Sequence, residues 1–96
     1  MPRIVVFYDI SNDKRRTKMA KILEALGLTR VQRSVFIGRG GVTKAREIIR
    51  AAMRIIDPET DSVAAVIVPE TKGYPLLVTG SLLNTPSKRE EPILVV

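Results

Sequence analysis

Asp9 is the residue of this sequence whose type and position most directly suggest chemistry. It closes the nearly continuous apolar run Arg3–Asp9, which is rich in β-branched residues and typical of a strand buried on both faces. A carboxylate at the end of such a strand is expected outside the core, because burying an unpaired charge is costly. It could accept backbone N–H bonds at the turn or help to cap a helix near Asp13. It could instead bind a hard cation, although the strand pattern alone favours the structural role.

Two missing residue types narrow the chemistry further. The sequence holds no cysteine and no histidine. This excludes disulfides, thiolate zinc sites, nucleophiles activated by histidine and histidine acid–base catalysis. Any bound metal must therefore use oxygen ligands, which favours Mg²⁺, Mn²⁺ or Ca²⁺.

Basic residues are concentrated in the first part of the chain. Residues 1–56 carry thirteen Lys and Arg against four Asp and Glu, whereas residues 57–96 carry three against six. A basic half of this kind is typical of proteins with a phosphate-rich partner, although a solvated surface is the simpler explanation for any single residue. Arginine is well suited to contacts with a nucleic-acid backbone. Such contacts need few aromatic side chains, and the chain has only four aromatic residues. The candidate nucleic-acid contacts are Lys14, Arg15, Arg16, Lys18, Arg30, Arg33 and Arg39.

The elements that must position these residues follow from the apolar patterns. Strands are predicted at Arg3–Asp9, Thr29–Gln32, 34–38 and Ser62–Val68, and helices at 13–26 and 43–56. The second and third of these strands could instead be one bent strand. The order β-α-β-β-α-β is that of the ferredoxin-like fold, an α+β fold with an antiparallel sheet and both helices on one face. We expect one ferredoxin-like domain at 1–80 and a C-terminal extension at 81–96.

Two short apolar segments lie near the C-terminus. A strand is predicted at 76–79, and residues 93–96 form an apolar, β-prone end. Because exposed strands promote aggregation, the end is expected to pair with a strand of this chain or of another. The first apolar run of the sequence is too short for a signal peptide or a membrane span, so we expect a soluble, cytoplasmic protein with no membrane partner.

Two stretches of the sequence resemble a known family. VFYDISND at 6–13, followed by Arg15, Arg16 and Lys18, and GLTRVQRSVFIG at 27–38 closely resemble the CRISPR-associated protein 2 family. The tyrosine–aspartate strand end and the arginine-valine-glutamine-x-serine-valine-phenylalanine stretch are its distinguishing marks. They cover about the first 40 residues in the right order and separation.

The resemblance implies a ferredoxin-like homodimer in which the C-terminal strand of one subunit pairs with the sheet of the other. It implies two activities. One is metal-dependent endonuclease action on RNA or DNA, with Asp9 as the ligand of Mg²⁺, or of Mn²⁺ in its place. The other is scaffolding, in which the dimer bridges integrase subunits of the CRISPR-associated protein 1 family and holds duplex spacer DNA.

Carried over by position, the residues of the family's nuclease site are Tyr8, Asp9, Arg16, Arg30, Ser34 and Phe36. Two positions depart from the family pattern. Lys18 stands where some members have arginine, which keeps the charge and loses the bidentate fork. Arg33 stands where an aromatic residue is common, which adds a charge and removes a ring that could stack on a base.

The number of carboxylates in the chain distinguishes the nuclease hypothesis from the scaffold hypothesis. Phosphodiester hydrolysis on hard metals usually relies on several carboxylates, and one chain offers Asp9 with Asp13 four residues away. The nuclease hypothesis therefore requires a dimer that brings two copies of Asp9 together, whereas the scaffold hypothesis does not. Two other functions remain open at this point. One is a stand-alone toxin-type ribonuclease of the virulence-associated protein D kind. The other is a non-catalytic RNA-binding domain, which the lack of an aromatic-rich strand signature disfavours.

Overall fold

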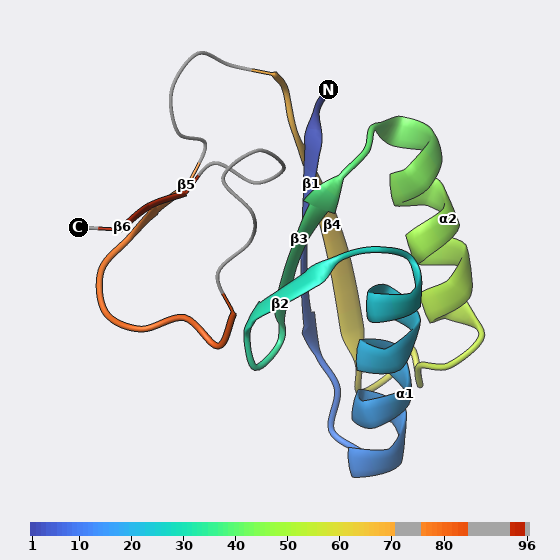
Figure 1. The fold of residues 1–96 in the computed structure, drawn as a ribbon. Coiled ribbons are helices and arrows are strands. Elements are labelled where there is room, and N and C mark those ends of the chain that lie inside the picture. Colours follow the sequence, from blue (N-terminus) through green and yellow to red (C-terminus); the bar gives the residue numbers. More distant parts are fainter. Residues whose placement is uncertain (71–75, 85–92, 96) are drawn as a thin grey trace.

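Two helices cover one face of a four-stranded antiparallel sheet (Figure 1). The computed structural model describes residues 1–70, 76–84 and 93–95. The main elements are β1 (Arg3–Asp9), α1 (Asp13–Ala25), β2 (Thr29–Gln32), β3 (Val35–Arg39), α2 (Val42–Met53) and β4 (Ser62–Val68). Two further strands follow, β5 (Leu76–Val78) and β6 (Ile93–Val95). The predicted order of elements and the α+β, ferredoxin-like class are confirmed.

The strand order is β2-β3-β1-β4, with every neighbouring pair antiparallel. β1 lies inside the sheet between β3 and β4, as its continuous apolar sequence predicted. Alternate residues of β1, namely Ile4, Val6 and Tyr8, are buried under the helices. Phe7 and Asp9 belong to the opposite face and are exposed, so the prediction that this strand is buried on both faces is wrong for the single chain. The alternation therefore carries Asp9 to the end of the central strand, outside the core.

The first helix begins and ends where its sequence indicates. Asn12 is the N-cap, and its side-chain oxygen accepts a hydrogen bond from the backbone N–H of Arg15 at 3.0 Å. Gly27 follows the helix with a φ of +89°, a left-handed conformation that favours glycine. Asn12, and not Asp9, therefore provides the cap at this end of the molecule.

The second helix is shorter than predicted. It ends at Met53 and not at residue 56, so the prediction of a helix to 56 is wrong by three residues. The N–H groups of Ile55 and Ile56 both bond to the carbonyl of Ala52, which closes the helix in a tight turn. Pro58 lies just beyond, and the residue before a proline is disfavoured in helical conformation.

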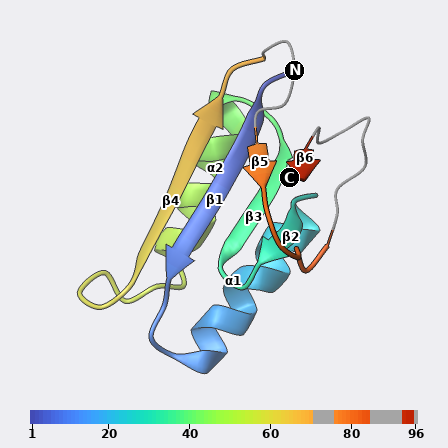
Figure 2. The same ribbon diagram turned by 90° about the vertical axis from the view of Figure 1, so that its left-hand side faces the viewer.

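The C-terminal strands form a separate sheet on the side away from the helices (Figure 2). β5 and β6 pair in parallel, with Leu76 opposite Ile93. The segment between them is attached to the edge of β2, where the N–H of Leu83 donates to Val31 O at 2.9 Å and Asn84 Nδ2 donates to Arg30 O at 2.7 Å. The apolar C-terminal strand β6 thus pairs with β5 of its own chain. Its pairing across a dimer and the division at residue 80 stay predictions, and residue 96 lies outside the described residues.

No helix in the described part of the chain is long and apolar enough to cross a membrane.

Candidate functional site

A polar cavity of about 470 Å³ opens where β1 leaves the sheet. Four segments contribute to it: the end of β1, the first turn of α1, β2, and the turn between β2 and β3. The lining residues are Asp9, Ile10, Arg16, Arg30, Arg33 and Ser34. Five of these are predicted site residues, drawn together from positions up to 25 apart in the sequence. The cavity therefore combines one carboxylate, three guanidinium groups and one hydroxyl.

Tyr8 and Phe36 lie beneath this cavity and not in its lining. Their ring centroids are 6.2 Å apart with the planes at 29°, and both residues are buried. The Arg30 guanidinium carbon lies 5.9 Å from the centre of the Phe36 ring. Because both rings are packed inside the protein, neither is available to stack on a base.

Three donors converge on the carbonyl oxygen of Arg33. Arg30 donates from Nε at 2.9 Å and from Nη2 at 2.6 Å, and the Tyr8 hydroxyl donates at 3.4 Å. These bonds fix the turn that presents the Arg33 and Ser34 side chains to the cavity. Tyr8 and Arg30 thus hold the wall of the site in place.

The Tyr8 hydroxyl is poorly suited to proton abstraction. Burial raises the pKa of its phenol, and the nearby charges of Arg30 and Arg16 only partly oppose that shift. The phenol therefore stays protonated near neutral pH, where a general base must be deprotonated. Its place beneath the cavity assigns it a positioning role.

Arg16 forms the α1 side of the cavity. Its Nη1 donates to the carbonyl of Ile10 at 3.1 Å, and its guanidinium pairs with Asp13 one turn earlier. The side chain thus connects the loop after β1 to the first turn of α1, and it remains exposed at the cavity wall.

Arg15 is directed to a different partner, Asp61. Arg15 Nε lies 2.8 Å from Asp61 Oδ2, and its Nη2 donates to Oδ1 at 3.3 Å. The Asp61 carboxylate is buried and also accepts bonds from the backbone N–H groups of Ser11 and Asp57 and from two hydroxyls, those of Ser11 and Thr60. The hydrogen bond from Arg15 is the main reason that the pKa of Asp61 lies well below its usual range. Among the candidate nucleic-acid contacts, Arg15 is therefore already engaged within the protein.

Asp61 is the important residue that the sequence reasoning missed. It connects the loop after α2 to Ser11, two residues beyond Asp9. The available signal was a carboxylate directly before the apolar strand Ser62–Val68.

The remaining candidate contacts lie away from this cavity. Lys14 and Lys18 line a shallow depression on α1 together with Asp13, Thr17 and Lys21, because positions 14, 18 and 21 lie on one face of the helix. Arg39 ends β3 opposite Arg3, at the other end of the sheet from Asp9. A seven-residue strand spans about 20 Å, so Arg39 does not share a site with Asp9.

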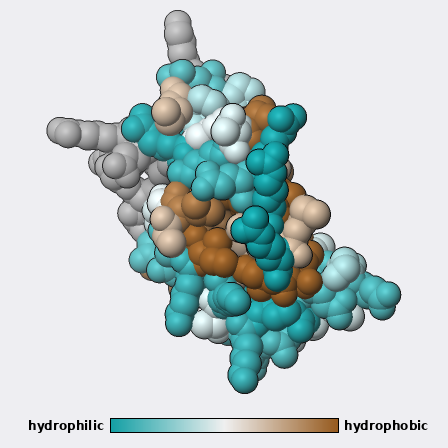
Figure 3. Space-filling model, turned by 90° about the vertical axis from the view of Figure 1, so that its right-hand side faces the viewer, coloured by the Kyte–Doolittle hydropathy of each residue, from teal (hydrophilic) through white to brown (hydrophobic). Residues whose placement is uncertain are grey.

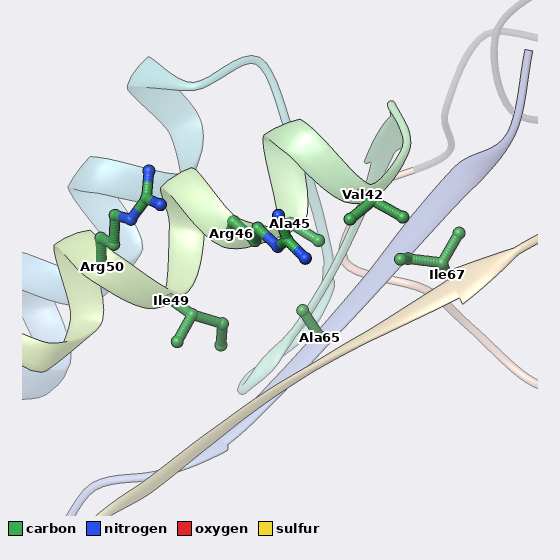
Figure 4. Close-up of a pocket in the computed structure, with 7 residues that line it drawn as sticks. All are labelled: Val42, Ala45, Arg46, Ile49, Arg50, Ala65 and Ile67. Carbon is green, nitrogen blue, oxygen red and sulfur yellow. The ribbon is translucent and has the colours of Figure 1, made fainter.

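A separate apolar groove of about 300 Å³ lies between α2 and the edge strand β4. Figure 3 shows apolar side chains gathered on the helix side of the molecule, with hydrophilic side chains crossing them. In Figure 4, Ile49 from α2 and Ala65 from β4 face each other across the groove. Arg46 and Arg50, which are four residues apart on α2, border the groove, so their side-chain stems can cover apolar surface.

The site of a single chain does not fit a hard divalent cation. The described residues contain no group of three or more acidic, histidine or cysteine side chains that could hold a metal. In the cavity Asp9 stands against three guanidinium groups, whereas Mg²⁺ or Mn²⁺ would need several oxygen ligands and negative charge. The same surroundings suit an anion such as phosphate, which arginine can hold with paired hydrogen bonds.

Comparisons with known proteins agree with the fold. Residues 1–73 match the family model described as CRISPR associated protein Cas2. The CRISPR-associated endoribonuclease Cas2 of Aeropyrum pernix is 41% identical over 69 residues, which cover 72% of this chain and 75% of that protein. A crystal structure of Cas2 superposes with a TM-score of 0.70 at 30% identity, covering 90% of this chain and 94% of the other.

A third relative is a fusion protein. The CRISPR-associated endonuclease Cas1/endonuclease Cas2 fusion of Thermoproteus tenax is 38% identical over 53 residues, or 55% of this chain and 20% of the fusion. The family match covers most of the chain, and both its helices and its four-stranded sheet agree with the known fold. This ferredoxin-like chain belongs to the CRISPR-associated protein Cas2 family.

Proposed function

We propose that the protein binds the phosphate backbone of nucleic acid at the cavity beside Asp9. In this proposal it acts in the cytoplasm as a dimeric scaffold that holds duplex spacer DNA for the CRISPR integrase. The main support is the cavity itself, where Arg16, Arg30 and Arg33 converge from three segments of the chain. The buried state of Tyr8 and Phe36 favours backbone contacts over base stacking. The relative that fuses Cas1 to Cas2 supports an integrase as the partner.

A homodimer would use surfaces that the single chain leaves open. Phe7 and Val66 are 48% and 46% exposed on the sheet face opposite the helices, and they share that face with Asp9. The edge of β2 carries the segment at Leu83 and Asn84, whereas β4 is the other edge of the sheet. We propose that the C-terminal strand of a second copy pairs at that β4 edge.

Metal-dependent endonuclease activity is the second part of the proposal, and it depends on the dimer. A two-fold axis through the face that carries Phe7 and Asp9 would bring the Asp9 carboxylates of both copies together. Without a metal the two carboxylates would repel each other. With Mg²⁺ or Mn²⁺ bound between them, they would supply the ligands that one chain lacks. The endoribonuclease name of the Aeropyrum pernix relative supports this part.

Removing the Arg33 side chain tests the proposed phosphate site. We expect Arg33→Ala to weaken binding to a spacer-length duplex about tenfold at low salt. The slope of log affinity against log salt should become shallower by about 1, because one phosphate contact is lost. Fluorescence anisotropy over a salt series measures both quantities. Arg54→Ala, which removes the same charge from an exposed position after α2, is the control. Equal effects of the two substitutions would show that only net charge matters.

Deleting residues 93–96 tests the dimer. We expect the deletion to shift the mass in solution from dimer toward monomer, because it removes the strand proposed to pair at the β4 edge. Light scattering coupled to size-exclusion chromatography gives the mass directly. Met53→Ala, which shortens a 71% exposed apolar side chain of α2, serves as the control and should leave the mass unchanged. A dimer that survives the deletion would contradict strand exchange.

A further inference from the structure

A second, smaller cavity of about 220 Å³ adjoins the one at Asp9. It is lined by Arg16, Thr17, Ala20, Lys21, Glu24 and Arg30. Arg16 and Arg30 also line the cavity at Asp9, so the two cavities are neighbours along α1. We call this second cavity the α1 trough.

The α1 trough is built from one face of α1 and from the edge strand β2. Thr17, Lys21 and Glu24 follow each other at i, i+4 and i+7, which places them on one helix face. Arg30 lies opposite on β2, the strand next to α1. Arg16 precedes Lys21 by about 7.5 Å along the helix axis, at 1.5 Å per residue. The cations are therefore arranged along the trough and not at a single point.

The two arginines of the trough are held in place before any ligand binds. Arg16 is fixed through the carbonyl of Ile10, and Arg30 is fixed through the carbonyl of Arg33. Arg30 uses Nε and Nη2 for that purpose, so its Nη1 is left to donate elsewhere. Pre-positioned donors lose less side-chain entropy when they bind an anion, which strengthens binding.

Glu24 is the one acidic residue in the lining of the α1 trough. It is exposed, it lines the cavity beside three cationic side chains, and no other carboxylate lies in the lining. The Glu24 carboxylate would repel a phosphate bound in the trough. Because the side chain is exposed, it is not needed for core packing.

We propose that the α1 trough is a second phosphate position of the same nucleic-acid strand, held by Lys21 and Thr17 beside Arg16 and Arg30, and that Glu24 limits its affinity. The inference rests on the proposed function, because the first phosphate occupies the cavity at Asp9. Lysine and threonine can each donate a hydrogen bond to a phosphate oxygen. Repulsion by Glu24 keeps the strand releasable, as a scaffold that passes DNA to an integrase requires.

Glu24→Gln is the decisive variant, because it should improve binding, and misfolding cannot produce a gain. We expect Glu24→Gln to tighten binding to the spacer-length duplex about threefold to tenfold at about 50 mM salt, with the gain shrinking as salt rises. Lys21→Ala should weaken binding and make the salt slope shallower by about 1. Anisotropy titrations over a salt series measure both effects.

Matched variants separate the trough from net charge. Glu47→Gln on α2 removes the same charge as Glu24→Gln, and Arg54→Ala removes the same charge as Lys21→Ala, both at exposed positions. If Lys21→Ala and Glu24→Gln behave like these controls while Arg33→Ala still weakens binding, the second phosphate position is overturned and the first one stands. If Arg33→Ala also behaves like its control, the proposed function fails and the inference fails with it.

Discussion

Replacing Asp9 by asparagine is expected to lower metal-dependent cleavage of RNA or duplex DNA by about a hundredfold or more, while duplex binding is retained. Asparagine keeps the shape of the side chain but removes the negative charge that a shared Mg²⁺ would need from each copy. Loss of that charge from a cavity with three guanidinium groups should leave phosphate binding unchanged or slightly tighter. Cleavage assays with and without Mg²⁺, alongside anisotropy titrations of the same protein, measure the two properties separately.

The control for this variant is Glu59→Gln, which removes a carboxylate charge from an exposed loop position. It should cleave like the wild type. Equal cleavage by wild type and Asp9→Asn would point to a contaminating nuclease and would clear Asp9 of a catalytic role. Loss of binding by Asp9→Asn would contradict the separation of the two functions.

The Asp9→Asn variant also decides whether cleavage or scaffolding is the activity that spacer integration requires. Integration of spacer DNA can be reconstituted with an integrase of the CRISPR-associated protein 1 family and either form of this chain. The cavity holds one carboxylate and three cationic side chains. Because the cations would hold the DNA backbone, we expect integration to survive Asp9→Asn. Integration that fails together with cleavage would instead make the metal essential to adaptation.

The sequence predicts the elements well because their signals are local. β-Branched runs and helix-spaced apolar residues gave every strand and helix, and the error at the end of α2 arose where a proline lay just beyond the apolar stripe. The grouping of Asp9 with Arg16, Arg30 and Ser34 came from the family resemblance, since spacing alone does not say which strand ends meet.

Other features were hidden because they depend on contacts between distant positions. A continuous apolar run does not reveal that Tyr8 faces the helices while Asp9 faces the open side. Likewise, Arg15 is one of several basic residues on α1, and only the fold brings it to Asp61, 46 positions away. The helix faces alone did not set Glu24 apart, because its cationic surroundings come partly from β2.

Replacing Asp61 by asparagine is expected to lower the melting temperature at neutral pH by about 10 °C or more. The Asp61 carboxylate joins three segments of the chain: the loop after β1 through Ser11, helix α1 through Arg15, and the loop after α2 through Asp57. The NH₂ group of an asparagine would face at least one of the N–H groups that now donate to the carboxylate, so that hydrogen bond would be lost. Arg15 would also lose its counter-charge. Glu59→Gln, two residues away and exposed, is the matched control and should melt like the wild type.

The pH dependence of this effect follows from the direction of the Asp61 shift. The pKa of Asp61 is depressed in the folded protein, so its contribution to stability is fully present above the unfolded value of about 3.9. The contribution is lost as the pH falls below that value, because the unfolded chain takes up the proton first. The gap in melting temperature between wild type and Asp61→Asn should therefore be constant from pH 7 to about pH 5 and should narrow toward pH 3. Thermal melts followed by circular dichroism measure this gap. A gap that stays constant down to pH 3 would mean that the shape of the side chain, and not its charge, holds the three segments together.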